Sequence, residues 1–248
     1  MSAQRILARG EERLFPHKHS SIDLRSPGLL GRSPMIGLWL FILGMLMFGG
    51  LTWNLFAHGP LLAWDTALAK TLPAIALKGP PFTETLMAIG FYLGKQVIMV
   101  LDVMLGVYYL YKRYWEELAM VTLGWMGAAM LFYWISTFLA RPRPPSQIWI
   151  IVNLPGFPSG HAISVVVCYG WLAYILAPKI RPMLGKIFVI ALALLLILFV
   201  GFSRIFTGGH YLTDILAGYG VGLAWSGFVY TLVEMYYQRK RSFHVQKR

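Results

Sequence analysis

Residues 158–214 read PSGHAISVVVCYGWLAYILAPKIRPMLGKIFVIALALLLILFVGFSRIFTGGHYLTD. This stretch holds two apolar runs, near 162–177 and 187–203, with a polar cluster before the first and another after the second. An α-helix crosses the hydrocarbon core of a bilayer with about 20 apolar residues. We therefore predict two transmembrane helices here, short enough that their polar ends lie close to the hydrocarbon boundary.

The whole chain has the composition of a membrane protein. Of its 248 residues, 57% are hydrophobic and 13% are charged, whereas about a quarter of the residues in a soluble domain are charged. The net charge of +12 would also suit a nucleic-acid-binding protein. Because the basic residues punctuate apolar runs, we interpret this charge as topological and expect membrane lipids, not nucleic acid, as partners.

Outward from this stretch, four further apolar runs are long enough to span a bilayer. A segment at 60–85 mixes apolar and charged residues, as amphipathic helices on a membrane surface do, and Pro73 within it is expected to kink or end that helix. The predicted fold class is all-α: a polytopic membrane protein with six transmembrane helices and an interfacial helix between the first two spans. The four added spans lie near 35–57, 87–110, 118–139 and 213–234.

Basic residues indicate the orientation of these spans. Sixteen of the 22 Lys and Arg residues precede span 1, follow span 6, or lie between spans 2 and 3 or spans 4 and 5. The positive-inside rule assigns that side to the cytoplasm. We thus predict a cytoplasmic basic arm at 1–34, a six-span domain at 35–236 and a cytoplasmic basic tail at 237–248. Residues 148–151, in the outward loop after span 3, are interpreted either as an interfacial anchor or as the lip of a lipid entrance.

Three polar clusters fall on the predicted outer face, each at the end of a span. They are Arg141-Pro142-Arg143-Pro144, Pro158-Ser159-Gly160-His161, and Ser203-Arg204 followed by His210 and Asp214. Positively charged groups at a lipid boundary suit a phosphate ligand. We therefore expect these clusters to converge.

The two histidines suit phosphoester cleavage without a metal. A neutral imidazole is available near pH 7 and can attack phosphorus. His210 and Asp214 have i, i+4 spacing, so on a helical turn the carboxylate can orient the ring. His161 then supplies the second imidazole, which protonates the leaving oxygen and later activates water.

Other residues in the clusters suit the phosphate oxygens. Arg143 and Arg204 carry forked donors that match phosphate geometry. Ser159 and Gly160 lie just before a predicted helix, where free backbone N–H groups favour an anion.

The three clusters together resemble the pattern of the type 2 phosphatidic acid phosphatase superfamily. These are membrane lipid phosphate phosphatases related to bacterial acid phosphatases and vanadium haloperoxidases. The family pattern is Lys, six residues and Arg-Pro; then Pro-Ser-Gly-His; then Ser-Arg, five residues, His, three residues and Asp. The second and third parts match fully at 158–161 and 203–214. The six-span layout extends the resemblance over about 35–236.

The resemblance implies a role for each residue and no metal or other cofactor. His210 would be the nucleophile and form a phosphohistidine, with Asp214 orienting it. His161 would act as general acid and then as general base. The phosphoryl oxygens would be held by Arg143, Arg204, Ser159 and Gly160.

The first part of the pattern departs from the family. Counting back from Arg143 gives Ser136 where the family has lysine, and counting back from Arg141 gives Trp134. One interpretation is lost activity. Our hypothesis is that Lys95 or Arg141 substitutes for the missing cation, since a lysine within a membrane segment is costly enough to need a reason. The alternative for Lys95 is that it simply extends to the interface.

The expected function is a lipid phosphate phosphatase acting at the outer leaflet. In a bacterial cell membrane, with the site facing the periplasm, undecaprenyl diphosphate is the leading substrate. Phosphatidic acid and phosphatidylglycerol phosphate follow closely. Two alternatives stay open: a lipid phosphotransferase using the same site, and a non-catalytic transporter or scaffold, which the serine at 136 favours. The sequence leaves the oligomeric state open.

Overall fold

A computed structural model describes residues 33–145 and 154–246, and every regular element in these residues is helical. Six helices are long and apolar enough to cross a membrane, which confirms the predicted fold class. The arm predicted at 1–34, except for its last two residues, and the loop residues 148–151 lie outside the described residues. The elements are α2 (Pro34–Phe56), α3 (Leu61–Ala76), α4 (Pro80–Phe91), a π-helical turn η1 (Tyr92–Gln96), α5 (Val97–Lys112), α6 (Trp115–Leu139), α7 (Gly160–Leu176), a 3-10 turn η2 (Ala177–Lys179), α8 (Met183–Phe206) and α9 (Leu212–Gln246).

Several boundaries differ from the sequence prediction. The segment expected to form one surface helix over 60–85 is divided, because α3 ends at Ala76 and Pro80 begins the second span. Proline suits the first helical position, where its missing N–H costs nothing. Pro73 lies inside α3, which runs on to Ala76, so it precedes the end of the helix by less than one turn.

Two later helices are longer than predicted. Helix α8 extends from Met183 to Phe206, so Arg204 lies in its last turn instead of beyond its end. Helix α9 continues to Gln246, with no break at residue 237 where the tail was expected to begin.

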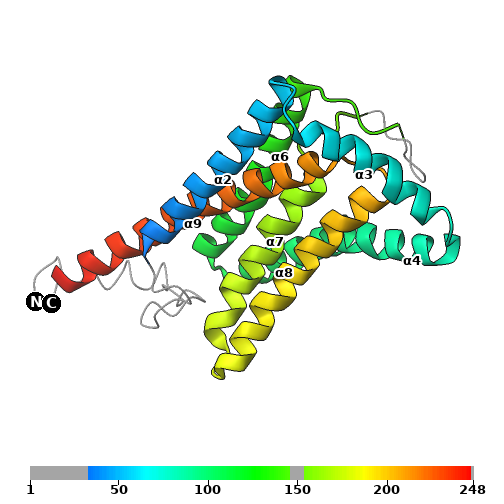
Figure 1. The fold of residues 1–248 in the computed structure, drawn as a ribbon. Helices are drawn as coiled ribbons and strands as arrows, with labels where there is room; N and C mark the ends of the chain where they lie inside the picture. Colours follow the sequence, from blue (N-terminus) through cyan, green and yellow to red (C-terminus); the bar gives the residue numbers. More distant parts are fainter. Residues whose placement is uncertain (1–32, 146–153, 247–248) are drawn as a thin grey trace, which may run out of the picture.

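Helices α2 and α9 run antiparallel and in close contact, and Figure 1 shows them side by side. Thr231 of α9 donates a hydrogen bond to the Pro34 carbonyl of α2. Ten residues along α2, a Cβ on Gly44 would lie 2.5 Å from the carbonyl oxygen of Gly220. This approach needs glycine because any side chain would force the helices apart. Small residues generally allow such close contact between membrane helices.

The remaining spans differ in how deeply they are buried. Helices α7 and α9 are the most buried spans, and α7 packs against both α8 and α9. Helix α8 instead exposes large apolar side chains such as Leu184, Phe188 and Leu195, as expected of a lipid-facing helix. Both buried helices begin at the end of the bundle where α6 and α8 finish, and this is where the polar clusters lie.

Candidate active site

The three polar clusters meet, as the sequence predicted. The Gly156 N–H donates to the Arg141 carbonyl at 2.7 Å, which joins the loop before α7 to the loop after α6. The Ser159 N–H donates to the Asp214 carbonyl at 2.9 Å, which joins the start of α7 to the first turn of α9. Backbone hydrogen bonds therefore hold the start of α7 against both the loop after α6 and the first turn of α9.

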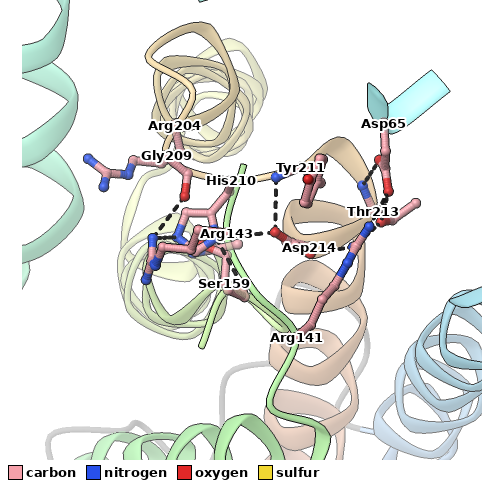
Figure 2. Close-up of polar contacts among 12 residues, drawn as sticks. Asp65, Arg141, Arg143, Ser159, Arg204, Gly209, His210, Tyr211, Thr213 and Asp214 are labelled. Atoms are coloured by element: carbon pink, nitrogen blue, oxygen red, sulfur yellow. Dashed lines mark hydrogen bonds and ion pairs between the residues drawn. The ribbon is translucent and has the colours of Figure 1, made fainter. Parts of the chain in front are cut away.

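His210 is buried at the centre of this junction, just before α9 (Figure 2). Its Nδ1 lies 2.9 Å from the Gly156 carbonyl oxygen, and its Nε2 lies 2.9 Å from Nη1 of Arg143. A carbonyl oxygen only accepts and a guanidinium only donates. The proton of the neutral ring must therefore reside on Nδ1, and Nε2 presents its lone pair toward Arg143.

Asp214 approaches the same ring nitrogen from α9. Its Oδ2 lies 3.5 Å from Nδ1 of His210 and accepts the Tyr211 N–H at 2.9 Å. The predicted contact between Asp214 and the ring is present, but the shorter contact of Nδ1 is with the Gly156 carbonyl oxygen. Burial lowers the pKa of His210, the hydrogen bond with Asp214 raises it in part, and the charge of Arg143 lowers it. The ring is consequently neutral at physiological pH.

Two backbone carbonyls aim Arg143 at the Nε2 lone pair of His210. Its Nε donates to the Leu154 carbonyl at 2.9 Å and its Nη1 to the Gly209 carbonyl at 2.8 Å. Burial lowers the pKa of the guanidinium and the nearby Asp214 carboxylate raises it, so the group stays charged.

Arg204 and His161 contribute polar atoms that lack partners. Arg204 is brought beside His210 by a tight turn in which its carbonyl accepts the N–H groups of Gly209 and His210. Within the described part of the chain, its buried Nε and the buried Nε2 of His161 have no hydrogen-bond partner. His161 interacts electrostatically with Arg204, His210 and Arg143. Figure 2 shows the guanidinium groups of Arg143 and Arg204 on the same side of His210.

Ser159 and Gly160 start helix α7 below this group. The Ser159 hydroxyl accepts the Ala162 N–H at 3.5 Å as an N-cap, which leaves its own proton free to be donated. Its backbone N–H is already bonded to Asp214, so Ser159 can offer an anion its hydroxyl but not its amide. The helix start favours negative charge there. In residues 33–145 and 154–246, no group of three or more His, Cys, Asp or Glu side chains is placed to hold a metal ion.

Comparison with known proteins identifies the family of this chain. The PAP2 superfamily model matches residues 119–238, which include all three clusters. The chain belongs to the PAP2 superfamily. It is 28% identical over 164 residues to phosphatidylglycerophosphatase B of Bacillus subtilis, covering 64% of this chain and 78% of that protein. It also resembles the crystal structure described as the first transmembrane PAP2-type phosphatidylglycerolphosphate phosphatase from Bacillus subtilis, with a TM-score of 0.63, 26% identity, and coverage of 78% of this chain and 93% of that one.

The chain is therefore a PAP2-type lipid phosphatase that is integral to the membrane. Within this superfamily its first motif is incomplete, and the structure gives the residues concerned other contacts. Ser136 is buried and its hydroxyl donates to the Tyr133 carbonyl of its own helix at 3.2 Å. Trp134 is exposed on the outer surface of α6.

The two candidate substitute cations have different surroundings. Arg141 has both terminal nitrogens engaged, one by Asp214 at 2.6 Å and the other by Asp65 at 2.8 Å. Lys95 is exposed and interacts electrostatically with His161. It lies in the π-helical turn η1 next to Gly94, where a Cβ would lie 3.1 Å from Cδ2 of His161.

Asp65 was not among the residues singled out from the sequence. It lies in α3, is 1% exposed, and bonds both Arg141 and Thr213 at the start of α9. A signal was present, because Leu68 and Leu72 follow Asp65 by three and seven residues. Those positions share one helix face, and both leucines pack into the core beside Ala162. A carboxylate on the buried face of a surface helix requires a cation partner.

Proposed function

We propose that this PAP2-type phosphatase removes the terminal phosphate of a lipid headgroup through a phosphohistidine on His210. The observation that carries the proposal is the arrangement at Nε2 of His210. Its lone pair faces the Arg143 guanidinium at 2.9 Å while Nδ1 holds the proton. A phosphoryl group bound by Arg143 would thus lie against the nitrogen that attacks it.

Each step has a residue to carry it. Nε2 of His210 forms a bond to phosphorus as the bond to the lipid oxygen breaks, and His161 donates a proton to that oxygen. His161, now neutral, takes a proton from water, whose oxygen attacks the phosphohistidine and releases inorganic phosphate. Arg143 and Arg204 hold the equatorial oxygens, where charge accumulates, assisted by the Ser159 hydroxyl and the start of α7 at Gly160.

Phosphatidylglycerol phosphate is the first substrate we propose. The two similar proteins are named for that activity, so we rank it above undecaprenyl diphosphate and phosphatidic acid. The site lies at the bundle end opposite the α7–α8 connection, which carries Lys179 and Arg181. By the positive-inside rule we propose that both termini are cytoplasmic and that the site acts on the outer leaflet of the cell membrane.

We further propose Lys95 as the cation that replaces the missing motif lysine. Single-turn π-helical segments are rare and occur often at functional sites, and η1 brings Lys95 into electrostatic reach of His161. Because Arg141 is held by two carboxylates, Lys95 is the better placed of the two candidates.

The role of Lys95 is tested by comparing a Lys95 variant with a variant of Ser136, which stands at the position of the motif lysine. Lys95→Ala is expected to lower kcat/KM for a short-chain lipid phosphate by about tenfold to a hundredfold, since it removes a phosphate contact. Ser136→Ala should change it by less than about twofold, because the hydroxyl bonds only within its own helix turn. Equal activity of Lys95→Ala and wild type would show that Lys95 does not replace the motif lysine.

The function itself is tested by phosphate release from a panel of the three lipid phosphates, with chelator present and no added metal. Wild type is expected to release inorganic phosphate, and His210→Ala is expected to be inactive. Labelled phosphate appearing on an acceptor lipid instead would make the protein a phosphotransferase. Equal turnover by wild type and His210→Ala, or none by either on any of the three lipids, would contradict the proposal.

A further inference from the structure

A buried ion-pair network connects the surface helix α3 to the active site. Arg141 donates to Asp65 at 2.8 Å through Nη2 and to Asp214 at 2.6 Å through Nη1. Nη1 also donates to the Thr213 hydroxyl at 2.7 Å. The exposed fractions are 1% for Asp65, 9% for Arg141 and 0% for Asp214. One arginine therefore bridges a carboxylate of α3 and the carboxylate that faces His210 (Figure 2).

Asp65 also contacts the start of α9 directly. Its Oδ1 accepts the Thr213 N–H at 3.0 Å, and its Oδ2 accepts the Thr213 hydroxyl at 2.5 Å. The first N–H groups of a helix have no partner within the helix and favour a negative charge. Asp65 thus caps α9 from another helix. It does so at a residue that lies three positions after His210 and next to Asp214.

These contacts do not reach the reacting atoms. Asp65 and Arg141 lie on the Nδ1 side of His210, whereas Arg143 faces Nε2. The network instead acts on Asp214, whose Oδ1 is held by Arg141 and whose Oδ2 faces the ring. Without Asp65, Arg141 would keep Asp214 as its one carboxylate partner among the contacts described above, and the Thr213 N–H would lose its acceptor. Both changes move the carboxylate that orients the nucleophile.

We propose that Asp65 is a positioning residue that holds Asp214, and through it His210, by way of Arg141 and the capped start of α9. This inference rests on the proposed role of His210 as the nucleophile. It makes α3 part of the catalytic apparatus. Trp64, next to Asp65 in α3, is exposed, so the same helix carries an exposed aromatic side chain and the buried carboxylate that holds Arg141.

The first test compares Asp65→Asn with Glu84→Gln in the full-length protein in lipid nanodiscs. Glu84 is an exposed carboxylate at the start of α4, so its variant removes the same charge without touching the network. Asp65→Asn is expected to lower kcat by about tenfold to a hundredfold, as loss of an orienting partner does. KM should change by less than about twofold, because Asp65 does not contact the phosphate. Glu84→Gln should match wild type.

A second test separates positioning from stability. Arg141→Gln leaves two buried carboxylates without their cation and should lower the melting temperature sharply. Adding Asp65→Asn removes one of those charges and should raise the melting temperature again. If the network positions Asp214, kcat of the double variant stays low although stability returns, and its loss is smaller than the product of the two single losses.

The outcomes distinguish this inference from the proposed function. Wild-type kcat in Asp65→Asn, a raised KM with unchanged kcat, or activity that recovers with stability in the double variant would each overturn the positioning role. The proposed function would survive all three, provided that wild type hydrolyses the lipid and His210→Ala does not. Inactive wild-type protein on every lipid phosphate would remove the proposed function, and the inference with it.

Discussion

The two arginines of the first motif lie two residues apart, yet they work on opposite sides of His210. Arg141 points to the Nδ1 side, where Asp65 and Asp214 bind its terminal nitrogens. Arg143 points to the Nε2 side, where its partners are two carbonyls and the ring nitrogen. One guanidinium is neutralised by carboxylates, and the other keeps its full charge beside the His210 ring.

We infer from this difference that the partners of each arginine determine its role. An Arg-Pro-Arg-Pro segment offers two equivalent charges in sequence. A carboxylate already bound to a guanidinium competes with any phosphate oxygen. We therefore propose that Arg141 stabilises the site and that Arg143 binds the substrate phosphate. The predictions below test this division between a catalytic side and a positioning side.

The largest effect is expected from Arg143→Lys. Lysine keeps the charge but loses the forked donors that match phosphate oxygens, and loss of one such donor typically costs about 10²- to 10³-fold. We expect kcat/KM to fall by that amount in a steady-state phosphate-release assay. The melting temperature should change little, because Arg143 is bonded to loop carbonyls and not to a buried carboxylate. A variant of unchanged activity and lowered stability would reverse the roles assigned to the two arginines.

A smaller effect is expected from Asp214→Asn, on the positioning side. Because Gly156 also holds Nδ1, we expect kcat to fall by about tenfold to a hundredfold. The pH profile provides a second readout. Burial lowers the pKa of His210, so the acid limb of kcat/KM in wild type should lie below the usual value of about 6.5.

The direction of the shift in Asp214→Asn follows from the same contacts. Asp214 raises the pKa of His210, and its removal leaves Arg143 and Arg204 to oppose protonation. The His210 ring then stays neutral to lower pH, and the acid limb should move downward. A limb that moves upward, or does not move, would show that His210 is not the group titrating in this limb.

The smallest effect is expected from Thr213→Val. This variant removes the hydroxyl shared by Arg141 and Asp65 but preserves the shape of the side chain and the direct ion pair. Loss of one such hydrogen bond costs about 1 kcal/mol, so kcat should fall by about twofold to tenfold, with a modest drop in melting temperature. A loss as large as that of Asp65→Asn would show that Thr213, and not the carboxylate, holds the start of α9.

The fold was predictable because the membrane imposes strong rules on the sequence. Apolar length alone located all six spans. Local details were not predictable from the same rules. The division at Ala76, the π-helical turn around Lys95 and the extension of α9 to Gln246 depend on packing and on hydrogen bonds between helices, and apolar length records neither.

The site residues were predictable only where they form a short motif or have a helical spacing in the sequence. The His210 and Asp214 spacing and the cluster at 158–161 indicated residues that the structure brings together. Asp65 has no such spacing, because it lies 148 positions from Thr213 and its partners come from other helices. The sequence also gave Arg141 and Lys95 as equivalent alternatives, and the carboxylates around Arg141 separate them.

The central claim is that Nε2 of His210 becomes covalently bonded to phosphorus. It is tested most directly by rapid quenching of the wild-type protein with a lipid phosphate labelled on its terminal phosphate, followed by peptide mapping under alkaline conditions that preserve phosphohistidine. We predict label on His210, absent in His210→Ala and retained for longer in His161→Ala when the leaving group is one that needs no proton. Label on His161 or on a serine, or turnover in which no protein ever carries label, would contradict the account.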